Sequence, residues 1–302
     1  MIRVLVTGAG GQVGTDVVRL LEGRAEVIAH GHDTMDLSDP SQLVARIREA
    51  APRVIVNAAA YTAVDRAQSE PEAAHTVNGV APGLIAREAR RTGALVVHFS
   101  TDYVFDGAKR TPYIESDATN PLGVYGRSKL EGERAVLDSR AAAIVLRTAW
   151  VYAPHGRNFM LTMLRLAAKG DPVRVVDDQH GAPTTSLAIA RAVMGILSVG
   201  TKGGAIEEAS IAKAAEARGL YHATASGETT WFGFAQAIFA ERARTTPGFV
   251  APPLWAITTA DYPTPAKRPA YSVLDNGKLQ RAFGVSLGDW RDGLGEAMSA
   301  LG

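Results

Sequence analysis

The chain opens with an apolar run, Ile2 to Val6, that leads directly into Gly8, Gly11 and Gly14. A short run of this kind is typical of a strand buried on both faces, and the stretch from Thr15 to Leu21 resembles a helix. Glycines at this turn remove side chains that would keep the backbone away from a ligand. Backbone N–H groups and the positive helix end then attract a pyrophosphate. We therefore predict a strand, a turn and a helix that bind a dinucleotide; an ordinary glycine-rich turn is the alternative.

Short β-branched runs alternate with longer helical stretches through the first half, which favours a doubly wound parallel α/β sheet, the Rossmann arrangement. The predicted strands are Arg3 to Thr7, Glu26 to His30, Val54 to Asn57, Leu95 to Ser100 and Ala143 to Thr148. Helices are predicted near Gly14 to Glu22, Pro40 to Ala50, Pro71 to Thr92 and Gly126 to Ser139, with a kink or restart at Pro82. We expect a binding crevice at the carboxyl ends of the strands.

The second half loses this alternation. Helical segments near residues 159–169, 186–197 and 231–242 are separated by loops and by a proline-rich stretch, 247–269. We predict a dinucleotide-binding domain over residues 1–152, to which later segments return, and a smaller, interleaved substrate-binding lobe over residues 153–302. Residues 201–218 lack apolar periodicity, and we predict a surface insertion with some helix there.

Composition excludes several classes of function. The 302 residues include 32 basic and 31 acidic side chains, a formal charge of +1, which gives no electrostatic reason to expect binding to nucleic acid or a membrane. No apolar run approaches the length of a membrane span. The absence of cysteine excludes disulfides and thiol chemistry and fits a cytoplasmic protein. The seven histidines show no set of metal-ligand spacings, so we predict no metal site.

Tyr125 and Lys129 lie four residues apart in a predicted helix, so they share one face. An ammonium group beside a phenol favours the ionised form and lowers the phenol pKa from about 10. The tyrosine then becomes usable as a proton donor near neutral pH. A solvated pair on an ordinary amphipathic helix is the alternative for this spacing taken alone.

Longer strings point to one family. Gly-x-x-Gly-x-x-Gly and Tyr-x-x-x-Lys are together the signatures of the short-chain dehydrogenases and reductases. Further strings, in order along nearly the whole chain except 201–218, closely resemble the dTDP-4-dehydrorhamnose reductases. They are Val56 to Asp65, Ser100 to Gly107, Leu146 to Tyr152, Gly156 to Phe159, Asp178 to Thr184, Gly219 to His222, Ser226 to Thr229 and Lys267 to Pro269.

The resemblance implies reduction of the 4-keto group of dTDP-4-dehydro-L-rhamnose to dTDP-L-rhamnose, with NADPH or NADH as the cofactor. The family's catalytic threonine, tyrosine and lysine match Thr101, Tyr125 and Lys129. In that role the nicotinamide passes hydride to C4, Tyr125 protonates the developing alkoxide and Thr101 helps to hold the oxygen. Lys129 also hydrogen-bonds the nicotinamide ribose.

The glycine turn, the strand ends and the resemblance together predict the cofactor contacts. They are Gly8, Gly10, Gly11, Gln12, Val13, Gly14, His30, Asp36, Leu37, Asn57, Ala58, Ala59, Ala60, Tyr61, Tyr125 and Lys129. Asp36 resembles part of the family's adenine-edge pair, but a helix cap is the alternative for it. The second strand ends in His30-Gly31-His32-Asp33, with no acid at the strand tip to grip the adenosine 2′-hydroxyl. The choice between NADPH and NADH is therefore open.

The resemblance also implies a set of residues that enclose the dTDP-linked 4-keto sugar. They are Val64, Asp65, Thr101, Asp102, Tyr103, Tyr125, Trp150 and Arg268. Trp150 is either a sugar-stacking residue or part of the core. Arg147 and Arg268 are candidate diphosphate partners because a guanidinium can grip phosphate oxygens bidentately, with a structural salt bridge as the alternative for each.

Two questions stay open beside this assignment. Some family members dimerise through a carboxylate-bound magnesium ion; Asp16 matches one ligand, but Leu187 stands where a second acid is expected, so we predict a monomer or homodimer without a metal bridge.

The competing functions are a 4-epimerase or 4,6-dehydratase with tightly bound NAD, and a non-catalytic regulatory subunit. Asp102 is followed by Tyr103 rather than by a glutamate, which disfavours the dehydratase.

Overall fold

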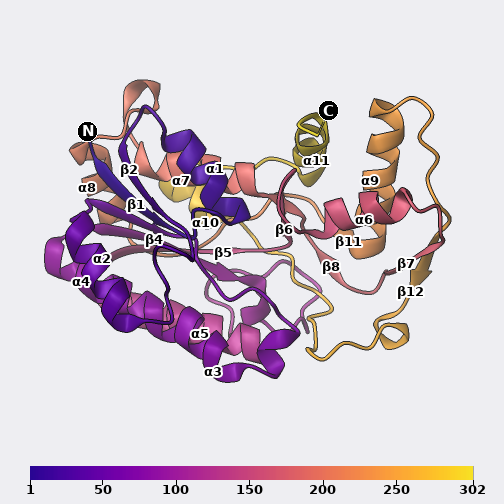
Figure 1. The fold of residues 1–302 in the computed structure, drawn as a ribbon, viewed down its shortest axis with the longest axis horizontal. Helices are drawn as coiled ribbons and strands as arrows, with labels where there is room; N and C mark the ends of the chain where they lie inside the picture. The colour runs from indigo at the N-terminus through magenta and orange to yellow at the C-terminus, as the bar shows by residue number, and fades with distance from the viewer. Residues whose placement is uncertain (302) are drawn as a thin grey trace.

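A six-stranded parallel sheet organises the computed structural model, which describes residues 1–301 (Figure 1). Its strand order is β2-β1-β3-β4-β5-β10. The strands are β1 (Arg3–Thr7), β2 (Glu26–His30), β3 (Val54–Asn57), β4 (Leu95–Thr101), β5 (Ala142–Thr148) and β10 (Gly219–His222). The predicted α/β class is confirmed, and the five strands predicted from β-branched runs match β1 to β5 to within one residue.

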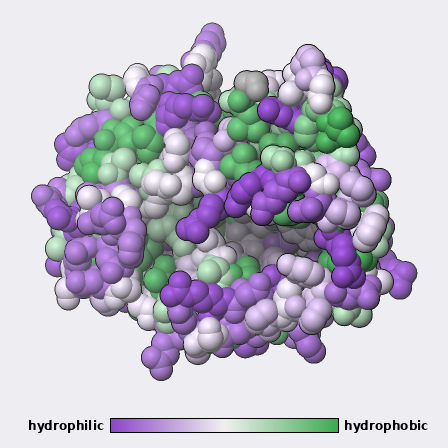
Figure 2. All heavy atoms as spheres, turned by 45° about the vertical axis from the view of Figure 1, so that its right-hand side comes forward, coloured by the Kyte–Doolittle hydropathy of each residue, from purple (hydrophilic) through white to green (hydrophobic). Residues whose placement is uncertain are grey.

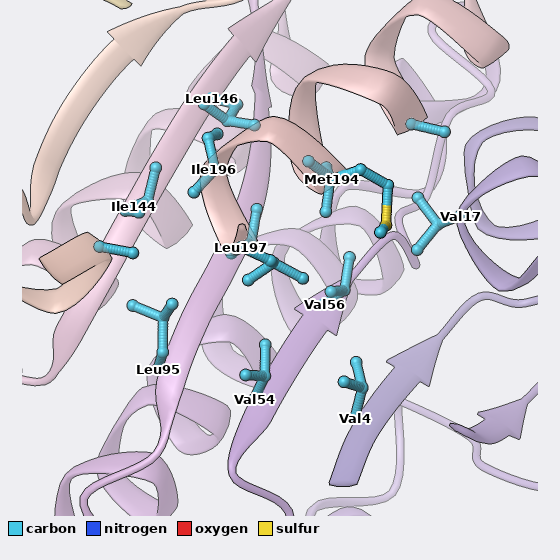
Figure 3. Close-up of a cluster of buried hydrophobic side chains, with 14 of the residues drawn as sticks. Val4, Val17, Val54, Val56, Leu95, Ile144, Leu146, Met194, Ile196 and Leu197 are labelled. Carbon is cyan, nitrogen blue, oxygen red and sulfur yellow. The ribbon is translucent and has the colours of Figure 1, made fainter. Parts of the chain in front are cut away.

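Helices cover both faces of the sheet, because successive strand residues point to opposite sides. One face packs on α1 (Gln12–Leu21), α7 (Ser186–Leu197), α8 (Glu208–Glu216) and α10 (Gly277–Phe283). The other face packs on α2 (Pro40–Ala50), α4 (Ala81–Thr92) and α5 (Val124–Asp138). Figure 3 shows the first cluster, in which Val17 of α1 and Leu197 of α7 lie against Val56 and neighbouring strand side chains.

The stretch 201–218 is part of this packing. It contains η4 (Lys202–Gly204) and α8, whose Ile211 and Ala214 are fully buried in the same cluster as Val17. These residues therefore do not form the expected surface insertion. Helix α8 instead covers the sheet and leads the chain into β10. Alanines gave weak periodicity here because small side chains suffice where a helix packs closely on a sheet.

The long helix predicted over residues 71–92 is interrupted. It consists of α3 (Pro71–His75), the π-helical η2 (Thr76–Val80) and α4, whose second residue is Pro82. Proline lacks an N–H to donate within a helix and fits best in a first turn. The predicted restart at Pro82 thus coincides with the beginning of α4.

A third hydrophobic cluster holds the smaller lobe together, at the right of Figure 1. It joins α6 (Phe159–Ala167), α9 (Trp231–Thr245) and α11 (Trp290–Ser299) around the fully buried Phe234 and Ile238. Short strand pairs complete it: β6 (Val151–Tyr152) with β9 (Thr184–Thr185), β7 (Val173–Val176) with β12 (Leu254–Ile257), and β8 (His180–Gly181) with β11 (Thr229–Thr230). The remaining elements are η1 (Arg66–Gln68), η3 (Asp102–Val104) and η5 (Thr259–Asp261).

Within residues 1–301, none of the helices combines the length and the apolar character that a bilayer crossing requires.

Candidate active site

The carboxyl ends of three neighbouring strands are joined by buried polar side chains. Thr7 of β1 donates a 2.7 Å hydrogen bond to Asn57 Oδ1 of β3, and Asn57 Nδ2 lies 3.0 Å from His98 Nδ1 of β4. Burial lowers the pKa of His98 well below its usual range, with the charge of Lys129 adding to the effect. The strand order reverses between β1 and β3, so this end of the sheet is the edge at which a doubly wound fold binds its ligand.

Close backbone approach explains the glycine turn. Gly8 has φ +67°, and a Cβ built there would lie 2.6 Å from the Ala59 backbone nitrogen. A Cβ at Gly14 would lie 2.1 Å from the Gly8 carbonyl oxygen, so α1 can approach the turn only with glycine at this position. A Cβ at Gly10 would meet no atom within 4 Å, because Gly10 faces an open cavity.

This cavity has a volume of about 700 Å³. The predicted cofactor residues that line it are Gly8, Gly10, Gly11, Gln12, Val13, Asp36, Leu37, Ala58, Ala59, Ala60, Tyr125 and Lys129. A long cavity-facing turn of glycines at a helix N-terminus, with Tyr125 and Lys129 on the same cavity, fits a dinucleotide. The surface is also visibly hollowed on the face that Figure 2 shows, where hydrophilic side chains form much of the rim.

Four predicted cofactor residues do not line the cavity. Gly14 packs beneath the turn, and Asn57 is held in the buried polar row described above. His30 Nδ1 lies 3.1 Å from Thr34 Oγ1. Tyr61 donates from its hydroxyl to Glu70 at 2.7 Å and from its backbone nitrogen to Asn78 at 2.8 Å.

Sequence reasoning missed other residues that line the cavity. They are Met35, Thr62, Val77, Phe99, Ser100, Thr148, Val151, Gly156 and Arg157; His32, which the sequence places just after the second strand, also lines the cavity. Phe99, Ser100 and Thr148 lie at the ends of β4 and β5, so the strand-end rule was a signal for them. Gly156 and Arg157 lie far along the chain from the glycine turn, and only their place in a family-like string marked them.

Asp36 has a local role besides lining the cavity. Its Oδ1 accepts hydrogen bonds from the Ser38 backbone nitrogen and hydroxyl, both at 2.8 Å, and these bonds lower its pKa. The cap of α2 is Asp39, which accepts from Ser41 and Gln42. The helix-cap alternative for Asp36 is therefore wrong.

The Tyr125 and Lys129 side chains differ in their partners. Lys129 Nζ donates a 2.6 Å hydrogen bond to the Phe99 carbonyl oxygen, and burial lowers the lysine pKa to about 8. Burial also raises the pKa of Tyr125 to about 12, although a hydrogen bond with Thr101 opposes the rise. The expectation of a lowered phenol pKa is thus not met, because burial is the largest influence on this group. The phenol is protonated near neutral pH.

Thr101 connects this pair to a buried carboxyl group. Thr101 ends β4 and donates a 3.0 Å hydrogen bond to Asp102 Oδ1. Burial raises the pKa of Asp102 to about 6, against hydrogen bonds with Ser272 and Thr101 that lower it. The ring of Tyr103 meets that of Tyr125 edge-on, with 5.5 Å between centroids. Thr101, Asp102, Tyr103 and Tyr125 therefore form one cluster, as their predicted roles require.

Arg268 and Asp65 pair across the two halves of the chain. The guanidinium donates to both carboxylate oxygens, at 2.7 and 3.1 Å, and these bonds are the main cause of a lowered Asp65 pKa. The half-buried Val64 precedes Asp65. Arg268 also lines a second cavity of about 340 Å³ in the smaller lobe, together with Trp231 and residues of α6 and β7. Arg268 therefore forms the salt bridge that was the alternative interpretation. It also lines a cavity, so a role in binding the diphosphate is compatible with this salt bridge.

Trp150 and Arg147 are both occupied by protein contacts. The Trp150 ring stacks on Trp231 at 3.6 Å, and its backbone has φ +48°. Arg147 is buried and pairs with Glu133 at 2.9 and 2.5 Å while it lies over the Phe105 ring. Arg147 therefore forms a structural salt bridge with Glu133, and its assignment as a diphosphate partner is wrong.

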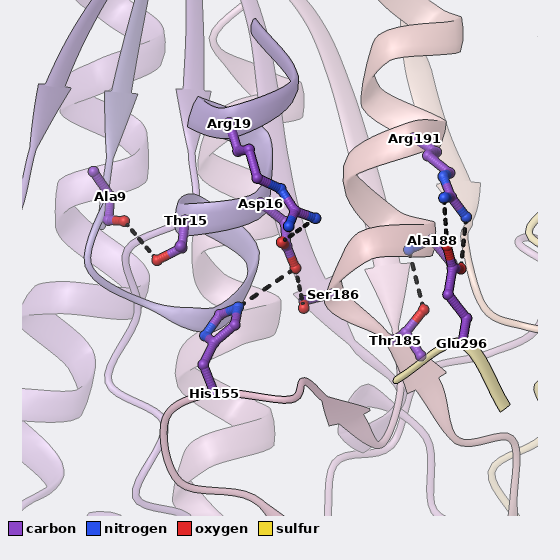
Figure 4. Close-up of polar contacts among 10 residues, drawn as sticks. All are labelled: Ala9, Thr15, Asp16, Arg19, His155, Thr185, Ser186, Ala188, Arg191 and Glu296. Atoms are coloured by element: carbon purple, nitrogen blue, oxygen red, sulfur yellow. Dashed lines mark hydrogen bonds and ion pairs between the residues drawn. The ribbon is translucent and has the colours of Figure 1, made fainter. Parts of the chain in front are cut away.

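Neighbouring side chains surround Asp16, which the sequence analysis considered as a magnesium ligand. It is buried, accepts a hydrogen bond from Ser186 and lies 3.0 Å from Arg19 (Figure 4). No cluster of three or more potential metal ligands occurs in the part of the chain that the structure describes.

A doubly wound sheet whose glycine turn shares one cavity with a Tyr-x-x-x-Lys pair defines a short-chain dehydrogenase/reductase. The chain belongs to the family described as the RmlD substrate binding domain, whose model matches residues 2–302. It is 46% identical to a dTDP-4-dehydrorhamnose reductase of Burkholderia thailandensis, over 97% of each chain. The resemblance drawn from the motifs is confirmed.

Solved structures agree with this membership. A dTDP-4-dehydrorhamnose reductase of Clostridium acetobutylicum is 34% identical and covers 99% of each chain with a TM-score of 0.88. One of Bacillus anthracis, in complex with NADP, is 28% identical with a TM-score of 0.88, and covers 99% of this chain and all of its own.

Proposed function

We propose that the protein reduces the 4-keto group of dTDP-4-dehydro-L-rhamnose to give dTDP-L-rhamnose, with NADPH or NADH as the cofactor. One observation carries this: Tyr125 and Lys129 line the same cavity as the glycine turn, and Thr101 is within hydrogen-bond reach of the phenol. Family membership over the whole chain and relatives that carry this activity by name support it.

The residues divide the work of the reaction. When bound, the cofactor supplies the hydride that reaches C4. Tyr125 then gives its proton to the developing alkoxide; its raised pKa keeps that proton in place near neutral pH. Thr101 orients the reacting oxygen from the end of β4. Lys129 contributes a buried positive charge that stabilises the phenolate left by proton transfer.

The sugar nucleotide is proposed to bind between the cofactor cavity and the smaller lobe. Asp65 and Arg268 bridge the two halves of the chain there. Asp102 and Tyr103 lie beside Tyr125, where a sugar would have to be held. Trp150, stacked on Trp231, is proposed to present an aromatic wall to it.

A direct assay tests the proposal. Purified protein is given dTDP-4-dehydro-L-rhamnose with NADPH and, separately, NADH, and both cofactor oxidation and the sugar product are measured. We expect stoichiometric formation of dTDP-L-rhamnose, with NADPH used at least as well as NADH, because no acid stands at the tip of β2 to repel a 2′-phosphate. Release of an epimer or dehydrated sugar without net cofactor oxidation would instead establish the epimerase or dehydratase, and no turnover would favour a regulatory subunit.

We also propose that the protein acts in the cytoplasm as a monomer or homodimer. The cysteine-free sequence suits a reducing compartment. Light scattering of the purified protein gives the oligomeric state directly.

A further inference from the structure

A loop from the second half of the chain lies against the glycine turn. Residues 153–158, here called the clasp loop, connect β6 to α6. Asn158 Nδ2 donates a 2.8 Å hydrogen bond to Gln12 Oε1, while Asn158 Oδ1 accepts from the Leu161 backbone nitrogen at 3.0 Å and caps α6. Gly156 has φ +74°, and a Cβ there would lie 3.3 Å from Gln12 Cγ. The clasp loop is thus fixed to the first residue of α1.

A second residue of the clasp loop, His155, lies beside α1, although its Nε2 forms no hydrogen bond there. His155 points toward Asp16, with 3.7 Å between Nε2 and Oδ2 (Figure 4). The same carboxylate accepts a hydrogen bond from Ser186 of α7 and pairs with Arg19 at 3.0 Å. Asp16 therefore already has a serine hydroxyl and the Arg19 guanidinium as close partners.

Arg157 lies between His155 and Asn158 in the sequence of the clasp loop. It is exposed, and it lines the 700 Å³ cavity together with Gly10, Gly11 and Gln12. Within residues 1–301 its guanidinium forms no salt bridge and no hydrogen bond with the protein. Arg147 and Arg268, by contrast, are each paired bidentately with a carboxylate. Arg157 thus presents all of its donors to the cavity or to solvent.

We propose that Arg157 is a cofactor-binding residue that grips the pyrophosphate of the dinucleotide together with the backbone of the glycine turn. The inference rests on the proposed function only in taking a dinucleotide as the ligand of this cavity. A guanidinium fork matches two phosphate oxygens, and the N-terminus of α1 adds a positive potential at the same place. The smaller lobe would therefore supply part of the cofactor site.

The position of Arg157 within the cavity favours a contact with the pyrophosphate over one with the 2′-phosphate. Asn158 donates a hydrogen bond to Gln12 at the start of α1, and a Cβ on Gly156 would lie 3.3 Å from Gln12 Cγ, so both chain neighbours of Arg157 lie close to this residue. A 2′-phosphate would lie at the tip of β2, where His32 lines the cavity.

The test is a binding titration that needs no sugar substrate. The dissociation constants of NADPH, NADH and ADP-ribose are measured by fluorescence or calorimetry for the wild-type protein, Arg157→Gln and Arg157→Lys. Arg165→Gln is the matched control, because Arg165 is an exposed arginine of α6 that does not line the cavity. Melting temperatures confirm that each variant is folded.

We expect Arg157→Gln to weaken all three ligands by about tenfold, the effect of losing a charge-assisted contact. Arg157→Lys should recover part of the loss, and Arg165→Gln should change nothing. A loss confined to NADPH would assign Arg157 to the 2′-phosphate and overturn the inference, and unchanged affinities for all three ligands would overturn it as well. If the wild-type protein binds ADP-ribose but does not reduce the keto sugar, the proposed function fails while the test of Arg157 remains valid.

Discussion

At the scale of single residues, burial rather than the neighbouring lysine sets the protonation of Tyr125. Its pKa is raised to about 12, whereas burial lowers that of Lys129 to about 8. A protonated phenol beside a buried cationic group is suited to donate a proton to an alkoxide, which is the stronger base. The spacing of the two residues was readable from the sequence; the balance between desolvation and charge was not.

The first prediction concerns the phenol proton. Tyr125→Phe keeps the ring and its edge contact with Tyr103 but removes the proton donor. We expect kcat to fall by about a hundredfold to ten-thousandfold, while the cofactor dissociation constant stays within about twofold of wild type. Steady-state kinetics and a cofactor titration measure the two quantities.

A remote phenol provides the control for this experiment. Tyr221→Phe removes a hydroxyl that donates to the Ala217 carbonyl oxygen at 2.5 Å, away from the cavity. It should leave kcat unchanged. A Tyr125→Phe variant with near-normal kcat would show that another group supplies the proton.

At the scale of elements, the strand–turn–helix start works because two glycines serve different purposes. Gly14 lets α1 pack on the turn, whereas Gly10 keeps the cavity side of the turn open. The same residue type thus has a folding role at one position and a binding role at the other.

The second prediction separates these roles. Gly14→Ala forces a Cβ to within 2.1 Å of the Gly8 carbonyl oxygen, so the backbone must shift; we expect the free energy of unfolding to fall by about 3 kcal/mol, as in other overpacked sites. Gly10→Ala meets no protein atom within 4 Å and should leave stability within about 0.5 kcal/mol of wild type. Denaturant titrations measure both values.

Cofactor binding completes the comparison. We expect Gly10→Ala to weaken NADPH binding by about tenfold or more, because a methyl group would stand between the backbone and the pyrophosphate. Unchanged affinity in the Gly10→Ala variant would mean that the dinucleotide does not lie against this turn.

At the scale of the whole molecule, buried histidines make folding sensitive to acid. His222 of β10 is fully buried, and burial, followed by the charge of Arg147, lowers its pKa to about 3. The unfolded chain takes up a proton there near pH 6.5, so between about pH 6.5 and 3 the unfolded state binds more protons. Stability must therefore fall as the pH falls through this window.

The third prediction isolates this contribution. Asp102, whose pKa is raised to about 6, has the opposite effect between about pH 6 and 4, and Glu88, lowered to about 2, adds acid sensitivity below about pH 4.5. His222→Leu should therefore reduce the pH slope of the unfolding free energy, by at most about 1.4 kcal/mol per pH unit. Denaturant unfolding of both proteins between pH 7 and 5 gives the slopes, and parallel curves would contradict the assignment.

The division into a domain over 1–152 and a lobe over 153–302 stays a prediction. Helices α7, α8 and α10 and strand β10 pack with the main sheet, as the expected return of later segments requires. The cluster around Phe234 gives the smaller lobe a core of its own.

Local pattern alone determined the Rossmann half, the family and the cavity-facing glycine turn. Apolar periodicity and glycine spacing are properties of neighbouring residues, so they can be read along the chain. Only the tertiary structure decided whether Arg147, Arg157 and Arg268 have partners. An arginine forms a salt bridge where the fold brings a carboxylate to it, and it stays unpaired where the fold brings none. Glu133 pairs with Arg147 and Asp65 pairs with Arg268, whereas no carboxylate pairs with Arg157 within residues 1–301. Contacts between residues far apart in the chain, such as Gln12 with Asn158, leave no periodic signal from which such a choice can be predicted.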